Sequence, residues 1–185
     1  YPMVKASVKM IVAAHDFMGV DAFAAAEAAA NDLDAEPKVL IVDGPEENES
    51  SWARFVEAGR SVNPADCEAA LTAVSPDDVC DILFTSGTTG KPKGVLQTHG
   101  TTVRQTIDTI EENGIVAGDR HLVLNPFFHV FGYKGGWLLG LFSGGTIMPV
   151  PVFDVENILQ LIEDEKITYF PAPPTVFFSI LQHPS

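Results

Sequence analysis

An α/β fold, layered and with mostly parallel sheets flanked by helices, is predicted by three features of the sequence. Short apolar runs bounded by turn residues alternate with segments whose apolar residues recur at helical spacing. The strands and helices predicted in this way follow one another in turn, which is the order that builds parallel crossover units. The composition, 46% hydrophobic and 19% charged, is that of a folded chain with a packed core rather than a disordered one.

The first 78 residues are predicted to form one α/β segment. Two apolar runs suit buried strands, and the Ala-rich stretch between them suits a helix that Asp21 would cap. A strand, a helix and a strand in this order indicate a parallel crossover. The expected strands are residues 8–13 and 37–42, and the expected helices are residues 21–31, 52–58 and 65–73.

Residues 79–185 are predicted to form a second α/β segment. A strand leads directly into a glycine-rich loop, after which strands and helices alternate to the end of the chain. Asp154 is a typical capping residue at a helix start, and Gly114 is a typical helix stop. The expected strands are residues 79–84, 94–97, 121–124, 146–150 and 167–170, and the expected helices are residues 103–113, 135–142, 155–162 and 175–181.

The loop at residues 85–95, TSGTTGKPKGV, has the composition of a phosphate-binding loop. Glycines allow positive φ angles and let backbone amides approach a ligand, while hydroxyl and ammonium groups donate to phosphate. An ordinary hairpin turn, which is the alternative, does not need so many donors. Pro92 stands where a Walker A motif needs a glycine, and no GxGxxG dinucleotide pattern is present. The loop therefore indicates another class of nucleotide site.

The charge distribution favours a small polyanionic ligand over nucleic acid or an anionic membrane. The formal net charge of -14 would repel both of the latter, yet residues 82–107 contain Lys91, Lys93 and Arg104 and no acidic residue. Glycines and prolines interrupt the uncharged stretch at 135–153, so no transmembrane segment is expected. No secretory leader pattern opens the chain, and two cysteines without metal or disulfide spacing fit a cytoplasmic protein.

Residues 85–95 resemble the signature loop of the adenylate-forming superfamily, which includes acyl-CoA synthetases and peptide-synthetase adenylation domains. Residues 125–132, NPFFHVFG, are similar to the next motif of that family. The resemblance implies that both segments, 1–78 and 79–185, belong to one large N-terminal domain, and that the C-terminal domain is absent. It implies an acid-thiol ligase that uses ATP and Mg²⁺ to form an acyl-adenylate and then transfers the acyl group to coenzyme A.

The same resemblance implies roles for the residues of the loop. Lys93 would be the main cation for the phosphates and Lys91 the second, and Thr88 would contact Mg²⁺. Lys93 and Thr88 are therefore the candidate catalytic residues. The residues implied to wrap the β- and γ-phosphates of ATP are Thr85, Ser86, Gly87, Thr88, Thr89 and Gly90.

An aromatic segment around Gly132 is the candidate acyl site. From composition alone, core packing is the favoured reading, with His129 bound to a backbone partner. The family resemblance implies instead that Phe128, His129, Gly132 and Tyr133 line the acyl pocket. His129 stands where amino-acid-activating members carry Asp, so a fatty or ring-bearing acid is expected. Residues 125–174 are also similar to actinobacterial ligases that act on steroid-ring fragments.

The ends of the chain suggest a piece of a longer protein. It begins at Tyr1 and stops at Ser185 after an apolar run, so we expect a fragment that is inactive alone and tends to self-associate through uncovered apolar surface. The alternative is a non-catalytic nucleotide-binding or scaffold module that has retained the loop.

Overall fold

The structure is a computed structural model in which the chain forms two compact units. The first unit comprises Tyr1–Val74 and Phe84–Gly94, and the second comprises Ser75–Leu83 and Val95–Ser185. The predicted segments, 1–78 and 79–185, concern the domains of the whole protein and stay a prediction. The residues that the structure describes are 1–16, 19–34, 36–86 and 90–184.

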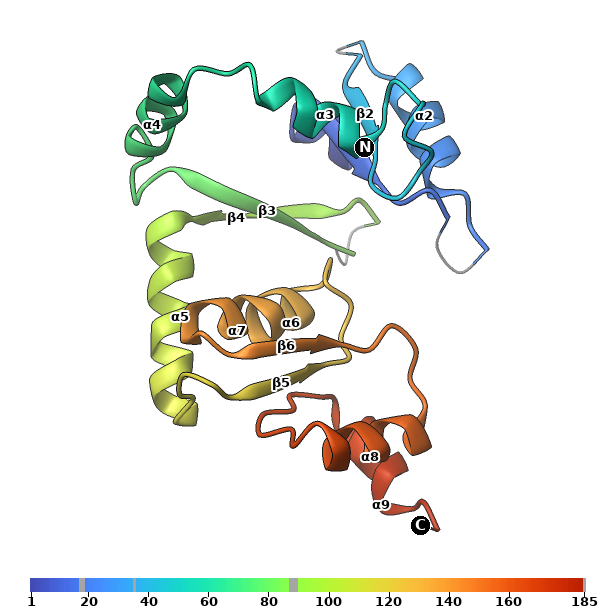
Figure 1. The fold of residues 1–185 in the computed structure, drawn as a ribbon, viewed down its shortest axis with the longest axis vertical. Helices are drawn as coiled ribbons and strands as arrows, with labels where there is room; N and C mark the ends of the chain where they lie inside the picture. Colours follow the sequence, from blue (N-terminus) through green and yellow to red (C-terminus); the bar gives the residue numbers. More distant parts are fainter. Residues whose placement is uncertain (17–18, 35, 87–89, 185) are drawn as a thin grey trace. The chain divides into compact units, whose positions relative to one another are not determined.

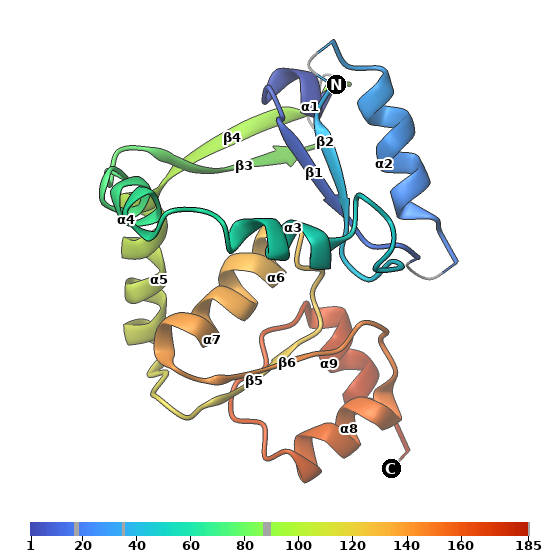
Figure 2. The ribbon, with the colours of Figure 1, turned by 45° about the horizontal axis from the view of Figure 1, so that its top comes forward.

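The first unit contains a parallel crossover, as the order of its apolar runs predicts. Strands β1 and β2 pair in parallel, with Met10 opposite Lys38 and Ala13 opposite Ile41, and Figure 2 shows α2 alongside them. The elements are α1 (Pro2–Lys5), β1 (Met10–Ala13), α2 (Ala22–Asn31), β2 (Lys38–Ile41), α3 (Trp52–Gly59) and α4 (Pro64–Thr72).

Capping and burial explain why these residues form these elements. Asp21 accepts a hydrogen bond from the Ala24 N–H at 2.8 Å, which confirms its predicted place at the start of α2. The buried face of α2 consists of alanines, whose small side chains let the helix lie close to the strands. The buried apolar residues of the unit are Ala26, Ala30, Leu40 and Ile41.

The second unit alternates strands and helices through most of its length. The chain first forms a pair of hydrogen-bonded strands, β3 and β4, whose connecting residues are grouped with the first unit, and then a long helix (Figure 1). The elements are β3 (Val79–Thr85), β4 (Lys93–Thr98), α5 (His99–Asn113), β5 (Arg120–Val123), α6 (Val130–Gly132), the π-helical turn η1 (Tyr133–Trp137), α7 (Leu138–Ser143), β6 (Thr146–Pro149), α8 (Val155–Asp164) and α9 (Pro174–Leu181).

The core of the second unit lies between the parallel pair β5 and β6 and the amphipathic helix α8. Leu122, Val150 and Ile158 form its buried centre, and each such side chain contributes about 1.5–3 kcal/mol on burial. Asp154 caps α8 by accepting from the Asn157 N–H at 2.8 Å, as predicted. Partly buried residues around the centre are Leu124, Met148, Leu161, Ile162, Ile167, Phe170 and Ile180.

Two predictions for the second unit are corrected. Residues 167–170 do not form a strand: Tyr169 makes a single bridge to His121, because Lys166 takes a φ of 50° just before the run and Pro171 has no N–H to continue a ladder. The helix predicted at 135–142 begins earlier, since α6, η1 and α7 follow one another without a break. The aromatic and glycine residues at 130–136 have low helix propensity, so the sequence did not indicate this earlier start.

Candidate functional site

The predicted phosphate loop connects β3 to β4. Thr85, the last residue of β3, donates its Oγ1 hydrogen to the carbonyl of Lys93, the first residue of β4, at 3.4 Å. Gly90 has a φ of 87°, which explains the need for glycine there. Apart from its chain neighbours, none of the described residues places a heavy atom within 4 Å of where a Cβ would stand on Gly90.

Most of the loop's described side chains are exposed. Ser86, Lys91 and Lys93 all belong to this exposed class, and Lys91 Nζ lies 5.9 Å from the centre of the Tyr1 ring. Hydroxyl and ammonium donors at the surface of a strand connection suit a phosphate chain. The predictions for Gly87, Thr88 and Thr89 fall outside the described residues.

Two of the predicted acyl-site residues, Phe128 and His129, lie at the surface of the second unit. Phe128 is 86% exposed, and His129 is exposed at the start of α6. The Nδ1 atom of His129 accepts a hydrogen bond from the Phe131 N–H at 3.2 Å. In the neutral ring the proton is therefore on Nε2, where it is a donor.

A hydrogen bond to the segment that follows residue 170 holds the beginning of this aromatic stretch. The Asn125 side-chain amide donates to the Pro171 carbonyl at 3.0 Å. Gly132, at the other end of the stretch, is buried, and a Cβ there would lie 2.2 Å from the Pro126 carbonyl oxygen and 2.3 Å from that of Asn125. The glycine is thus required by a close backbone approach, which is a structural role whatever the segment binds.

Tyr133 differs from the other predicted acyl-site residues because its polar end points into the unit. Its hydroxyl donates to Asp81 Oδ2 at 3.4 Å, and its ring stacks on Trp137 with centres 4.9 Å apart. Burial, followed by the negative charge of Asp81, raises the pKa of the Tyr133 hydroxyl. This group remains a neutral donor to the carboxylate at physiological pH.

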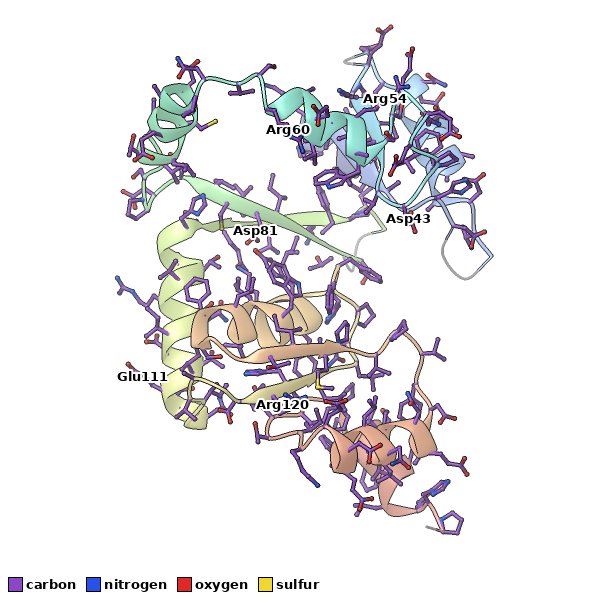
Figure 3. The ribbon with its side chains drawn as sticks, viewed as in Figure 1. Asp43, Arg54, Arg60, Asp81, Glu111 and Arg120 are labelled. Atoms are coloured by element: carbon purple, nitrogen blue, oxygen red, sulfur yellow. The ribbon has the colours of Figure 1, made fainter. Side chains whose placement is uncertain are left out.

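A buried lysine next to Tyr133 was not anticipated from the sequence. Lys134 is 7% exposed and forms an ion pair with Asp81 at 3.0 Å, and Figure 3 labels Asp81 on β3. The signal that could have revealed it is its position, since Lys134 directly precedes the uncharged stretch at 135–153. A charge that adjoins such a stretch needs a partner inside the protein if it is buried with it.

The part of the chain that the structure describes contains neither a metal-ligand cluster nor a membrane-spanning helix. No group of three or more His, Cys, Asp or Glu side chains within it could hold a metal ion. No helix among these residues is both long enough and apolar enough to cross a membrane.

Comparisons with known proteins agree with the predicted resemblance. Two curated relatives share one name, a methyl-dioxo-octahydroindenyl-propanoyl:CoA ligase. The relative from Rhodococcus jostii (strain RHA1) is 39% identical over 94% of this chain, and the relative from Mycobacterium tuberculosis is 40% identical over 98% of it. The chain spans 35% of the length of each.

Solved structures show the same fold. ATP-bound MatB from Rhodopseudomonas palustris has a TM-score of 0.71 and 25% identity, and the likeness covers 100% of this chain and 33% of MatB. The N-terminal domain of FACL13 from Mycobacterium tuberculosis has a TM-score of 0.72 and 22% identity, covering 98% of this chain and 41% of that domain. These likenesses confirm the α/β fold predicted for an N-terminal domain.

The match to a family model extends along the whole sequence. The model of the AMP-binding enzymes covers residues 1–185, which include the phosphate loop, the aromatic segment and the buried lysine. A full-length family match together with relatives at 39% and 40% identity establishes membership. The chain therefore belongs to the AMP-binding enzyme family.

Proposed function

We propose that this protein is an acyl-CoA synthetase, which activates a carboxylic acid with ATP and transfers the acyl group to coenzyme A. The observation that carries the proposal is the loop between β3 and β4, where exposed lysines and a glycine at positive φ occur in a chain 40% identical to a CoA ligase. A carboxylate would attack the α-phosphorus of ATP, release pyrophosphate and form an acyl-adenylate. The thiol of coenzyme A would then displace AMP.

The first step joins two anions, so the residues must mainly hold the reactants together and neutralise charge. Lys93 is proposed to bind the phosphates that leave as pyrophosphate, with Lys91 in support. When bound, Mg²⁺ would withdraw further charge from these phosphates, and Thr88 is the residue proposed to contact it. The other proposed phosphate ligands are the hydroxyls and backbone amides of Thr85, Ser86, Gly87, Thr89 and Gly90.

The acid is proposed to be fatty or ring-bearing rather than an amino acid. The Nε2–H of His129 supports this, since a neutral ring donor can bind a carboxylate and offers nothing to an ammonium group. The large exposed ring of Phe128 suits an apolar acid. Tyr133 and Gly132 are proposed to support the pocket from within. The names of the curated relatives make bicyclic propanoates the first acids to test.

The remaining partners follow from the same proposal. The protein would bind the acid, ATP and coenzyme A, and it would act in the cytoplasm. It would not bind nucleic acid, in keeping with its net charge of -14. Exposed apolar side chains at Phe178, 63% exposed, and Leu181, 80% exposed, support self-association of the chain.

The deciding experiment is acid-dependent pyrophosphate release by the full-length protein. We expect release with bicyclic propanoates or fatty acids, no release with α-amino acids, and formation of an acyl-CoA when coenzyme A is added. ATP binding without release for any acid would refute the ligase and favour the non-catalytic nucleotide-binding module. Release with amino acids alone would refute the proposed acid class.

A further inference from the structure

A lysine that takes no direct part in the proposed reaction lies buried in the second unit. Lys134 is 7% exposed and belongs to η1, the π-helical turn between α6 and α7. Single π-helical turns within helices are frequent at functional sites, because the extra residue changes which side chains face inward. In this turn, the ammonium group is directed into the interior of the unit.

Acceptors on three different elements meet this ammonium group. Asp81 Oδ2 of β3 lies 3.0 Å from Lys134 Nζ, and Thr102 Oγ1 of α5 lies 2.7 Å from it. Gln97 Oε1 of β4 accepts a further hydrogen bond. Since an ammonium group has three donors, the capacity of Lys134 is used completely by side chains of β3, β4 and α5.

Stability alone does not explain this cluster. Removing an ammonium and a carboxylate from water is costly, and apolar side chains of similar size are often as stabilising or better. The carboxylate is also incompletely satisfied, because Asp81 Oδ1 is buried and has no hydrogen-bond partner among the described residues. A need for one particular arrangement of the joined elements explains the pair better.

The joined elements lead to both proposed substrate segments. Asp81 and Gln97 each lie four residues from the strand end that meets the phosphate loop, in β3 and β4 respectively. Lys134 follows the aromatic segment directly, and the neighbouring Tyr133 shares the Asp81 carboxylate with it. Within the second unit, one ammonium group therefore joins the strands that continue into the phosphate loop to the turn that follows the acyl segment.

We propose that Lys134 is a positioning residue for acid activation, acting as a brace between β3, β4 and η1. The inference rests on the proposed function in that the two substrates are ATP and a carboxylic acid. Two anions react only when they are held in a narrow range of geometries, and a displacement of about 1 Å can cost on the order of 100-fold in rate. The brace would restrict β3, β4 and η1 to one arrangement within the second unit, from which both substrate segments continue.

The test uses three variants of the full-length protein. Lys134→Met removes the charge and keeps most of the side-chain length. Asp81→Leu combined with Lys134→Met replaces the pair by apolar groups, so neither member is left buried as an unpaired charge. Lys166→Met, at an exposed lysine of the same unit, is the matched control.

Steady-state kinetics separate positioning from folding. We expect the double variant to melt near the wild-type Tm, while its kcat for pyrophosphate release falls by about tenfold or more and its KM values change little, because the reactants still bind but are no longer held in register. The Lys166→Met control should keep wild-type constants. A stably folded double variant with wild-type KM and kcat would show that the Lys134–Asp81 pair has only a packing role, and it would overturn the proposal.

Amide hydrogen exchange gives a readout that needs no activity. In the double variant we expect amides of β4 and of residues 130–137 to exchange about tenfold faster, with β1 and β2 unchanged. Unchanged exchange in either β4 or residues 130–137 would also overturn the brace. If the wild-type protein released no pyrophosphate with any acid, the proposed function would fail instead, and exchange would still decide whether Lys134 links the two segments.

Discussion

The lysines of the phosphate loop and the lysine of η1 carry the same charge in opposite surroundings. Lys91 and Lys93 are exposed, whereas Lys134 is 7% exposed and donates to three side chains of the protein. An exposed ammonium can exchange water for an incoming polyanion at little cost. A buried one cannot leave its acceptors without leaving them unpaired, which costs several kcal/mol. The first kind suits ligand binding, and the second suits the positioning of elements.

The largest expected effect concerns an exposed lysine of the phosphate loop. Lys93→Ala in the full-length protein should lower acid-dependent pyrophosphate release by about 100-fold, as expected for the loss of a group that stabilises developing charge. The Tm should stay unchanged, because the side chain is exposed. Lys9→Ala, at another exposed lysine, is the control. A rate equal to wild type would contradict the role of Lys93 in phosphate binding. It would also contradict the proposed difference between exposed, ligand-binding lysines and the buried, positioning lysine.

His129 is a useful intermediate, because it is exposed and yet has a backbone partner. His129→Ala should destabilise the protein by about 1 kcal/mol through loss of the cap on α6, whereas His129→Asn keeps a capping side chain. Both variants should raise KM for the acid by about tenfold if the ring donates to the carboxylate. Thermal unfolding and initial rates measure the two effects separately. An acid KM that rises only in the destabilised variant would assign His129 to the cap alone.

The smallest expected effect concerns His121, a buried side chain whose charged form is disfavoured by burial. Burial lowers the pKa of His121 from its usual 6.5, and its Nδ1 has no hydrogen-bond partner among the described residues. The unfolded chain therefore takes up the proton first, so the contribution of His121 to stability is constant above about pH 6.5 and falls as the pH drops below it. His121→Gln should flatten this decline. Urea unfolding at about pH 8 and about pH 5 measures it, and an equal decline in both proteins would assign it to other groups.

Local signals carried most of the fold prediction. The strands β1, β2, β3, β5 and β6 lie where apolar runs predict them, and Asp21 and Asp154 cap their helices as expected. The strand predicted at residues 167–170 was wrong. Its residue types favour a strand, but the backbone at Lys166 and the prolines that follow prevent pairing beyond one bridge. Propensity describes a residue's preference, and the neighbouring backbone decided the outcome here.

The candidate site was predictable where it depends on a contiguous motif. The loop at 85–95 and the segment at 125–132 are such motifs, although the roles of their residues stay a prediction. The Lys134 cluster was not predictable, because Thr102, Gln97 and Asp81 precede the lysine by 32, 37 and 53 positions in the sequence. Lysine is also among the residue types least often buried, so composition argued against it.

The glycine at position 132 sets a boundary for attempts to change which acid the protein accepts. Because a methyl group there would meet two carbonyl oxygens at 2.2 and 2.3 Å, variation at this position disturbs the backbone before it alters any surface. Phe128, at 86% exposure, carries no such constraint. Redesign of substrate preference should therefore diversify the aromatic residues ahead of the glycine and leave the glycine itself untouched.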